Sequence, residues 1–426
     1  MTRLDRRRFL KGAGALAGAG ALGFPRPALA QAKPRVIVVG GGPGGATAAK
    51  YVARDSNGAI EVTLVEPQRA FTTCFHSNLY LGGFRDLASI THSYDKLASA
   101  YGVRLVHQAA AAIDRDRKLV RLADGSDMAW DRLVVAPGID LRFDSVPGYS
   151  EAASEAMPHA WKAGPQTQEL KRRLDALSDG ALIVMVAPPN PYRCPPGPYE
   201  RVSMMAHVLK GKGHKTSRIV ILDPKESFSK QALFQEGWER HYPGMIEWQD
   251  PKMHGGIKGV DPSAMTVETA LETHKASLVN VIPAQTAGKV ARDAGLTNQS
   301  GWCPVDPASM RSANDPNVYV VGDACIPGDM PKSAFSANSQ AKVAAMTIRG
   351  ELAQGRTFPA RYTNTCWSLI ETDDAVKVGG RYEPRDGRIA AVETFISQKD
   401  EPPEVRRQTQ AENMGWYAGI AADVFS

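Results

Sequence analysis

Two turns rich in glycine or proline follow apolar runs in this sequence, and only the first has residue types that suit a pyrophosphate. In RVIVVGGGPGG, Gly40 permits the tight bend, Gly42 lets the backbone approach the phosphates, and Gly45 lets the following helix pack on the strand. The second turn, after ALIVMVA (181–187), reads PPNPYRCPPGP. Because proline lacks a backbone N–H and has a fixed φ, this turn cannot cradle a pyrophosphate. The sequence therefore predicts one dinucleotide site, with a cysteine, Cys194, in place of a second.

The surroundings of the first turn are those of an adenine dinucleotide site. A β-run precedes the turn, and the helix-compatible stretch ATAAKYVARD follows it. The next predicted strand, EVTLVE, ends in Glu66, about 20 residues after the last glycine. A carboxylate at this place is expected to bind the ribose 2′-hydroxyl and to disfavour a 2′-phosphate.

Two later segments indicate that the dinucleotide is FAD. LVVAPG, which includes Ala136 and Gly138, resembles the strand ending in Ala-Thr-Gly of two-dinucleotide flavoproteins, with proline in place of threonine. NVYVVGDA resembles their second flavin motif, in which the aspartate, here Asp323, binds the ribityl chain. KSAFSANSQAKVAAMTI then predicts a helix whose N-terminal amides would stabilise negative charge on the reduced ring. Two further candidate contacts to the cofactor lie in this helix: Ser336 and Asn338.

Five cysteines could take part in redox chemistry. Cys74 comes shortly after Glu66, so we expect the chain there to run along the flavin. Cys194 precedes PPGPYE, where proline predicts a helix start whose dipole would lower the pKa of the thiol. Cys303 and Cys325 flank the second flavin motif and are expected to be buried packing residues. No CxxC pair indicates a zinc site, and no CxxCH motif attaches a c-type haem to this chain.

The alternation of strand and helix patterns predicts an α/β protein, and its length predicts two or three domains. We expect a discontinuous FAD-binding domain in residues 31–145 and 285–350. Residues 146–284 contain their own strands and are expected to form a degenerate NAD-binding-like domain. Residues 351–426 resemble the C-terminal interface domain of two-dinucleotide flavoproteins.

The N-terminus predicts the compartment. DRRRFLK resembles a twin-arginine export signal with Arg6 and Arg7 as the pair, and a weakly apolar run follows it. Small residues around Ala30 offer a cleavage site, so residues 1–30 are expected to be a signal peptide. Twin-arginine export carries folded proteins, which suits a chain that acquires its flavin before export. The mature protein is therefore expected in an oxidising periplasm, where a disulfide persists.

The net charge of the mature chain is small. The full sequence carries a formal charge of +6, and most of the excess lies in the predicted signal: Arg3, Arg6, Arg7, Arg8, Lys11 and Arg26 against Asp5. No basic stripe with interleaved aromatic residues remains, so nucleic acid is not an expected partner. No mature segment is apolar over 18 residues, so no membrane span is predicted. The C-terminal tail is only mildly amphipathic, which argues against docking on a membrane surface.

Six segments together resemble the flavoprotein subunit of flavocytochrome c sulfide dehydrogenase: GGGPGGATAAKY, TTCFHSN, RCPPGPYER, GWCPVD, GDACIPGDMPKSAFSANSQ and NTCWS. The resemblance covers essentially the whole mature chain. It implies a glutathione-reductase-like fold with two dinucleotide-binding domains, and a c-type cytochrome subunit that carries the haem. It also implies that Cys74 bonds the flavin 8α-methyl group. Cys194 and Cys366 then correspond to the redox disulfide beside the isoalloxazine, and Glu200 corresponds to a proton acceptor.

The implied reaction is FAD-dependent oxidation of sulfide. Hydrosulfide would attack the disulfide and leave a persulfide, and the freed thiolate would pass two electrons to the flavin. The flavin would then release single electrons to the haem of the partner. Glu200 could take the proton from incoming sulfide, although an exposed surface glutamate is an equally good interpretation from the sequence.

Three other functions stay open. A sulfide:quinone reductase-like enzyme shares the fold and the paired cysteines, but it needs an apolar C-terminus that docks on a membrane. A pyridine-nucleotide-dependent disulfide reductase needs a second glycine turn and a close-set cysteine pair, which this sequence lacks. An FAD-loaded structural or assembly protein would not be reduced by sulfide at all.

Overall fold

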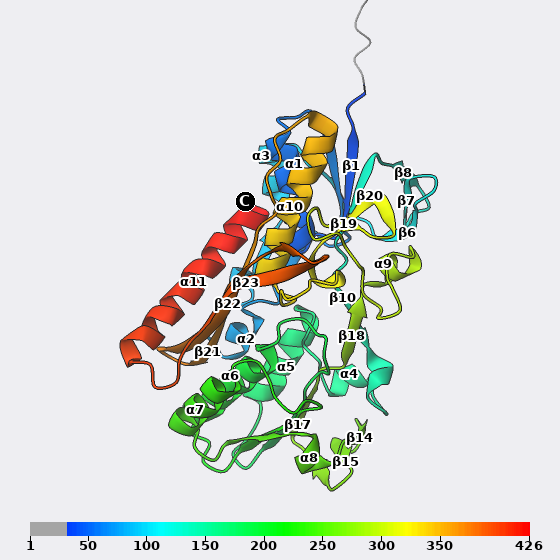
Figure 1. Ribbon diagram of the computed structural model, residues 1–426. Helices are drawn as coiled ribbons and strands as arrows, with labels where there is room; N and C mark the ends of the chain where they lie inside the picture. The colour runs from blue at the N-terminus through cyan, green and yellow to red at the C-terminus, as the bar shows by residue number, and fades with distance from the viewer. Residues whose placement is uncertain (1–31) are drawn as a thin grey trace, which may run out of the picture. The chain divides into compact units, whose positions relative to one another are not determined.

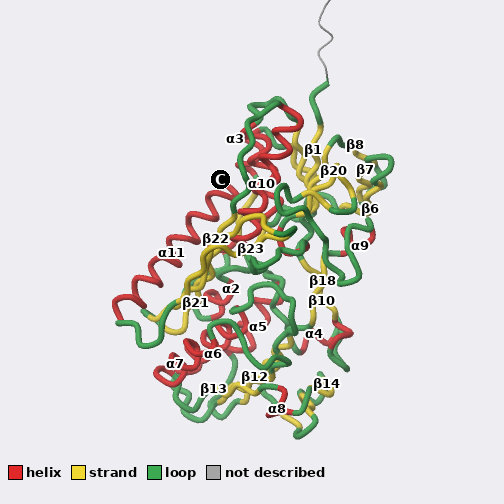
Figure 2. Tube along the Cα trace, in the orientation of Figure 1, coloured by secondary structure: helices red, strands yellow, loops and turns green. Residues whose placement is uncertain are grey.

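A computed structural model describes residues 32–426, of which Pro34–Ser426 form one compact unit. The predicted twin-arginine signal in residues 1–30 lies outside the described residues. Figures 1 and 2 show the arrangement of the helices and strands. Among the described residues, no helix combines the length and the apolar character that crossing a membrane requires.

A six-stranded sheet supports the glycine turn. Its order is β19 (Arg311–Ser312), β20 (Asp315–Val320), β9 (Arg132–Val135), β1 (Arg35–Val39), β2 (Glu61–Val65) and β5 (Arg104–Val106). All neighbours are parallel except β19, which pairs antiparallel with β20. The strand β1 is buried at every position after Arg35, as expected of a parallel strand covered on both faces. Two helices pack together on this sheet: α1 (Pro43–Asp55) and α10 (Ala334–Ala353).

A second, four-stranded parallel sheet has the order β13 (Ile246–Gln249), β12 (Arg218–Leu222), β11 (Leu182–Val186) and β17 (Leu278–Val281). The helices of this part of the chain are α4 (Ala153–Ala156), α5 (Pro165–Asp175), α6 (Gly197–Gly211), α7 (Gln231–His241) and α8 (Pro251–His254). Between the two sheets lies an antiparallel pair, β10 (Ile139–Arg142) with β18 (Ala284–Ala287) (Figure 2). Two stacked α/β units of this kind confirm the predicted α/β class.

The C-terminal part of the chain is an antiparallel sheet and one long helix. The strands are β21 (Tyr362–Glu371), β22 (Asp374–Arg385) and β23 (Arg388–Ile396), and the helix is α11 (Pro403–Phe425). In Figure 1 the red helix α11 runs along this sheet. The helix α6 packs on β21, so a strand from the last part of the chain meets the second parallel unit.

The remaining elements are short. They are the helices α2 (Ser77–Leu81), α3 (Asp95–Tyr101) and α9 (Lys289–Asp293), and the 3₁₀ turns Ala88–Ile90, Phe143–Ser145 and Gly322–Ala324. The outlying strands are β3 (Ala70–Thr72) with β4 (Thr91–Ser93), β6 (Ala110–Asp114) with β7 (Leu119–Leu122) and β8 (Asp127–Ala129), and β14 (Ile257–Asp261) with β15 (Thr266–Thr269) and β16 (Thr273–Lys275). The domain boundaries expected at 145, 285 and 351 stay predictions.

Candidate active site

The glycine turn between β1 and α1 leaves no room for side chains at two of its predicted positions. A Cβ at Gly45 would lie 1.8 Å from the carbonyl oxygen of Gly40, and one at Gly40, where φ is +99°, would lie 2.3 Å from that of Ala136. A Cβ at Gly42 would meet only the Phe71 ring, at 3.6 Å. The helix α1 begins directly after Gly42, so the surface at Gly42 suits the close approach of a phosphate to a helix start.

Glu66 follows β2 and reaches back to this turn. Its carboxylate accepts a hydrogen bond from the Gly41 amide at 2.7 Å and another from the Gln68 amide at 2.9 Å. The nearby Tyr94 hydroxyl is buried and has no hydrogen-bond partner among the described residues. The side chain predicted to bind the ribose therefore lies beside the glycine turn.

The second flavin motif places Asp323 on a buried, partly unsatisfied polar surface. One carboxylate oxygen of Asp323 lies 3.6 Å from the Arg193 guanidinium, and the other has no partner among the described residues. The side-chain amide of Gln285 and the indole N–H of Trp161 are also buried without a partner in the described part of the chain. Buried polar groups are normally hydrogen-bonded, so these groups fit the polar edge of a flavin. FAD, when bound, would supply a two-electron acceptor that can also release single electrons.

The other predicted cofactor contacts lie around this surface. Ala136 and Gly138 follow β9, and Gly138 has a φ of +65° that favours glycine. Ser336 is in the first turn of α10, which Ser333 caps by accepting a hydrogen bond from the Ser336 amide at 3.0 Å. The Asn338 amide donates to Thr47 and Asp423, at 2.9 and 2.8 Å, so it ties α10 to α1 and α11. Contact of these residues with FAD stays a prediction.

The predicted reactive residues come together in one pocket. Cys74, Cys194, Cys366 and Glu200 line it, although they come from three separate parts of the chain. Its other lining residues are aromatic, basic, or small and mostly polar: Phe75, His76, Ser77, Asn78, Trp161, Arg193, Gly197, Arg201, Ser333, Ala334, Phe335, Thr365, Trp367, Asn413 and Trp416. A largely apolar cavity with a few converging polar groups is typical of a cofactor and substrate site.

Cys194 lies in the loop that replaces the second glycine turn. Its φ is +57°, an unusual value for a residue with a side chain, and its amide donates to the Lys332 carbonyl at 2.8 Å. A Cβ on Gly197, the first residue of α6, would lie 2.9 Å from the Cys194 sulfur, so the thiol packs against the helix start. Burial nevertheless raises the pKa of this thiol well above its usual value, and the charges of Cys366 and Glu200 raise it further. The expectation that the helix start lowers this pKa is therefore wrong.

Cys366 lies in β21 beside a side chain that can donate to its sulfur. The Asn364 amide nitrogen is 3.5 Å from the Cys366 sulfur, and the Ser333 hydroxyl donates to the Asn364 oxygen at 2.5 Å, which orients the amide. Burial raises the pKa of Cys366, whereas Asn364 and the charge of Lys230 oppose this rise. All five cysteines are free thiols in this structure. The predicted Cys194–Cys366 disulfide therefore stays a proposal.

Glu200 is buried in the first turn of α6, so the alternative of an exposed surface glutamate is wrong. Its carboxylate accepts from the Asn78 amide at 2.8 Å and from the Leu369 backbone amide at 3.0 Å. Arg201 donates to the Asn78 oxygen at 3.1 Å and so fixes the direction of that amide. Burial raises the pKa of Glu200, and the two hydrogen bonds only partly oppose this effect. A carboxylate whose pKa is raised in this way is a stronger proton acceptor than an exposed one.

Cys74 begins the short loop before α2. The Ser77 hydroxyl donates to the Cys74 carbonyl at 2.6 Å, and burial raises the pKa of the thiol against the charge of Arg193. The next residue but one, His76, has a buried ring whose Nδ1 accepts from Arg85 and whose Nε2 faces the Asn413 oxygen, both at 2.9 Å. Burial lowers the pKa of His76 to about 3, so the ring is neutral and structural.

Two residues of the site gave no signal in the sequence. Arg193 is close to Cys74, Cys194 and Asp323, but it reads as an ordinary basic residue in a proline-rich loop. Lys230 caps the start of α7 and is buried beneath β21, although KESFSKQ has no pattern that sets it apart from a surface loop. Only the tertiary fold brings Arg193 to Cys74 and Asp323, and Lys230 to Cys366.

Cys303 and Cys325 are buried neighbours in an isolated parallel bridge, as expected of packing residues. No group of His, Cys, Asp and Glu among residues 32–426 could hold a metal ion.

The acid at the end of β12 is taken up by protein groups. Asp223 accepts from the Tyr199 hydroxyl at 2.6 Å and the Trp248 indole at 3.0 Å, and it pairs with Lys225 at 2.6 Å. The second strand of a dinucleotide-binding unit commonly ends in such an acid, which binds a ribose. Here its oxygens are buried and bonded within the protein.

The chain matches three family models. Residues 167–283 match the central part of the sulfide dehydrogenase [flavocytochrome c] flavoprotein chain, and residues 358–425 match the flavin-binding part of flavocytochrome c sulphide dehydrogenase. Residues 34–176 match the pyridine nucleotide-disulphide oxidoreductase family. Together with the two sheets described above, these matches confirm the predicted flavoprotein fold with two dinucleotide-binding units.

Individual proteins with similar sequences include two kinds of sulfide oxidoreductase. The chain is 61% identical over 44 residues to the sulfide dehydrogenase [flavocytochrome c] flavoprotein chain of Chlorobaculum thiosulfatiphilum, a stretch covering 10% of this chain and 90% of that one. It is 22% identical over 317 residues to the mitochondrial sulfide:quinone oxidoreductase of Mus musculus, covering 71% and 68% of the two chains.

Solved structures share the fold at low sequence identity. The sulfide:quinone oxidoreductase of Aquifex aeolicus superposes with a TM-score of 0.71 at 17% identity over 92% of both chains. Putidaredoxin reductase, in its covalent complex with putidaredoxin, has a TM-score of 0.64 at 18% identity over 89% of this chain and 93% of that one. With the glycine turn, the flavin motif and the cysteine pocket in place, the chain belongs to the flavoprotein chains of flavocytochrome c sulfide dehydrogenase, a family of FAD-dependent sulfide oxidoreductases.

Proposed function

We propose that this chain oxidises sulfide through a redox-active disulfide between Cys194 and Cys366 and passes the electrons, through FAD, to a c-type cytochrome subunit. The observation that carries this proposal is the pocket in which these two cysteines, Cys74 and the buried Glu200 meet. The family relationship supports the choice of sulfide as substrate.

The protein residues would act in a fixed order. Hydrosulfide attacks one sulfur of the disulfide, the Cys194–Cys366 bond breaks, and a persulfide remains on one cysteine while the other leaves as a thiolate. When the incoming species is H₂S, Glu200 accepts its proton, which its raised pKa and its position in the pocket favour. The thiolate is then held in the pocket as the electron donor to the cofactor.

Cys74 is proposed to hold FAD covalently through a thioether to the 8α position. Its sulfur is in the same pocket as the redox cysteines. Acid precipitation of the protein should leave the yellow chromophore on the pellet, and Cys74→Ala should release nearly all of it into the supernatant. Cys303→Ala, at a buried cysteine outside the pocket, is the matched control and should keep the flavin. A colourless wild-type pellet would exclude a covalent bond.

The site of action is proposed to be the periplasm after twin-arginine export, with a heterodimer as the working unit. The Arg6–Arg7 pair and the absence of a haem-attachment motif in this sequence support this. A soluble c-type cytochrome in the same compartment would accept electrons one at a time.

The reaction can be tested by following the flavin absorbance without oxygen. Sulfide should bleach the flavin of the purified protein, whereas NADH should not, because the second glycine turn is replaced and Asp223 is already bonded. Cys194→Ser should keep the flavin spectrum but lose bleaching by sulfide. Reduction by NADH at a comparable rate would point to a pyridine-nucleotide-dependent enzyme instead.

A sulfide:quinone reductase-like enzyme is the second candidate, because proteins of that name match most of this chain. Docking on a membrane requires an exposed apolar face. The exposed large apolar side chains of α11 amount to Val405 among the described residues, and the other exposed positions are polar or small. This surface favours the cytochrome over a quinone. Activity with a soluble quinone that exceeds activity with the cytochrome would reverse the assignment.

A further inference from the structure

Lys230 is a buried lysine held against the strand that carries Cys366. Only 5% of its surface is exposed. The ammonium donates to the Ser368 hydroxyl at 2.8 Å, to the Cys366 carbonyl at 3.1 Å and to the Val376 carbonyl at 3.4 Å. These partners lie on β21 and on its neighbour β22, so the position of the charge is set by the same strand as Cys366.

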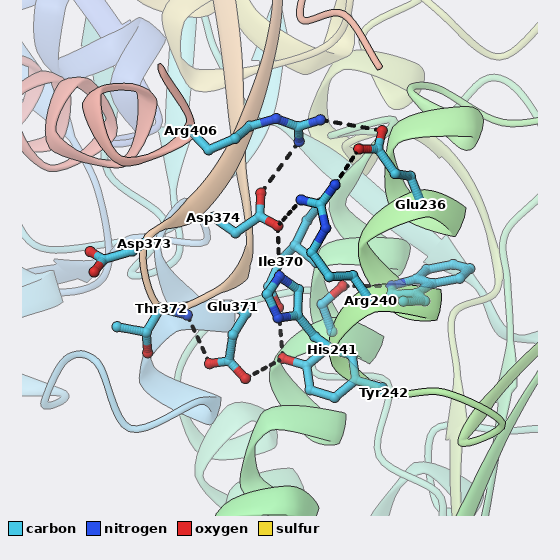
Figure 3. A network of polar contacts seen from close by, with 12 residues as sticks. Glu236, Arg240, His241, Tyr242, Ile370, Glu371, Thr372, Asp373, Asp374 and Arg406 are labelled. Atoms are coloured by element: carbon cyan, nitrogen blue, oxygen red, sulfur yellow. Dashed lines mark hydrogen bonds and ion pairs between the residues drawn. The ribbon is translucent and has the colours of Figure 1, made fainter. Parts of the chain in front are cut away.

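The helix α7 fixes Lys230 in place from both ends. Lys230 caps the start of α7 with a φ of +63°, a left-handed conformation. In the middle of the helix, a Cβ on Gly237 would lie 2.7 Å from Ile370, so the helix lies close to β21. At its end, Arg240 and His241 bind Asp374 on the next strand (Figure 3). The charge beneath Cys366 is therefore positioned by a helix that is docked along the length of β21.

The surroundings of the two sulfurs differ. The Cys366 sulfur receives the Asn364 amide, which Ser333 orients, and it is near the Lys230 charge. The Cys194 sulfur receives no hydrogen bond from the described residues. Arg193 lies near Cys194, but its guanidinium also binds the Trp161 carbonyl and Asp323. In thiol–disulfide exchange the sulfur that better stabilises negative charge leaves.

We propose that Lys230 is a positioning residue that makes Cys366 the leaving sulfur, so that hydrosulfide is captured as a persulfide on Cys194. This inference rests on the proposed function. In the step, the sulfur of HS⁻ forms a bond to the Cys194 sulfur, the Cys194–Cys366 bond breaks, and its electron pair stays on Cys366 as a thiolate. The proton of HS⁻ stays on the persulfide, and the total number of electrons does not change.

The first experiment locates the persulfide in the wild-type holoenzyme. One equivalent of sulfide is added without oxygen, the sulfurs are trapped with an alkylating reagent, and peptides are identified by mass. The extra sulfur should be on the Cys194 peptide. A persulfide on the Cys366 peptide would overturn the inference and leave the proposed function intact. Absence of both persulfide and flavin bleaching would instead overturn the proposed function.

The second experiment measures the thiol of Cys366 itself, in a Cys194→Ser background where it cannot form the disulfide. The titratable groups facing it are Lys230 at the start of α7, Glu200 on α6 and Tyr382 on β22. Burial lowers the pKa of Lys230 to about 8, so Lys230 carries its charge only below that pH. In this part of the pH profile, Lys230→Met should slow the alkylation of Cys366 about tenfold, because an opposite charge nearby favours the thiolate. Lys230→Arg should restore most of the wild-type profile.

Lys210→Met is the matched control. Lys210 pairs with Glu371 at the end of β21 but does not line the pocket, so this change should leave the alkylation profile where it was. An unchanged profile in folded, FAD-loaded Lys230→Met would contradict the inference. If that variant does not fold, Asn364→Ala, which removes the amide donor to the sulfur, should shift the profile in the same direction. An unchanged alkylation profile in Asn364→Ala, together with a persulfide on Cys366, would refute the assignment of Cys366 as the leaving sulfur.

Discussion

Burial raises the pKa of Glu200, an effect that its neighbours in sequence do not indicate. In PYER the residue reads as part of a polar helix surface, but α6 turns it into the pocket, where two N–H groups hold the carboxylate. Burial raises its pKa, so the group is protonated in acid and ionised only above this raised pKa. Only the ionised form can accept a proton from sulfide.

We therefore predict a pH-dependent effect of Glu200→Gln. Where Glu200 is ionised and sulfide enters as H₂S, the variant should oxidise sulfide about 100-fold more slowly than wild type, the size expected for loss of a proton acceptor. As the pH falls through the raised pKa of Glu200, the wild-type residue becomes protonated and the ratio of the two rates should approach one. The ratio should also return toward one at high pH, where sulfide enters as HS⁻ and needs no proton acceptor. Glu404→Gln, at an exposed position on α11, should show a ratio of one throughout.

A pH-independent ratio for Glu200→Gln would mean that the residue acts through hydrogen bonding to Asn78 and Leu369 rather than through proton transfer.

At the scale of elements, the glycine turn makes two separable contributions. Gly45 is required by packing, because the carbonyl of Gly40 occupies the space that a Cβ would take. Gly42 has room for a Cβ next to Phe71, so its role is in the approach of the phosphates. The same turn thus serves both the fold and the cofactor, through different residues.

We expect Gly42→Ala and Gly45→Ala to fail in different ways. Gly42→Ala should fold with normal circular dichroism but should contain less FAD as purified, because the added methyl group blocks the phosphates and less FAD is bound before its attachment to Cys74. Gly45→Ala should lower the melting temperature or prevent soluble expression, because the clash is with backbone. If Gly42→Ala kept full FAD and Gly45→Ala were as stable as wild type, the turn would not be the dinucleotide site.

A second element-scale feature is the charge cluster that joins α7, the β21–β22 turn and α11 (Figure 3). Arg406 is 2% exposed and lies 3.3 Å from Asp374 and 3.4 Å from Glu236. Arg240 binds the same two carboxylates from α7. The cluster holds the turn that follows Cys366, so it also determines where β21 lies against α7.

Arg406→Leu should reduce the free energy of unfolding by about 3 kcal/mol, because it removes a positive charge that compensates the buried carboxylates of Asp374 and Glu236. The neighbouring Arg407 is a matched control. It is 60% exposed and pairs with Asp373 at 3.9 Å, so Arg407→Leu should change stability by about 0.5 kcal/mol or less. Chemical denaturation of the two variants under the same conditions measures the difference. Equal losses would mean that the cluster adds nothing to stability.

Some features of these elements could be predicted from the sequence, and others could not. Strand and helix patterns were sufficient for the α/β class, and the glycine turn and the GDA segment could be located because their functions impose local sequence rules. The pKa of Cys194 was misjudged, since the helix start is a local feature whereas burial depends on the whole pocket. Lys230 could not be found, because its partners on β21 are distant in sequence. The nearness of Cys194 and Cys366 followed from a family resemblance and from no spacing rule.

At the scale of the whole molecule, the two parallel sheets have different tasks. The first supports the glycine turn and the flavin motif, and the second presents Cys194 and Glu200 on the loop and helix after β11. The C-terminal sheet adds Cys366 to complete the pocket. In the mechanism proposed above, electrons enter through sulfur and need an outlet other than a pyridine nucleotide.

We predict that the outlet is a c-type cytochrome. Under anaerobic conditions, sulfide should reduce added cytochrome c rapidly only when this protein is present, and Cys366→Ser should abolish the reduction because the disulfide can no longer form. Cys325→Ser, at a buried cysteine outside the pocket, should keep the activity if the variant retains FAD. Haem takes one electron at a time, so two cytochrome molecules should be reduced for each sulfide oxidised to the level of a persulfide or elemental sulfur. Formation of peroxide from oxygen at a much higher rate than reduction of cytochrome would identify the chain as an oxidase and contradict the proposed partner.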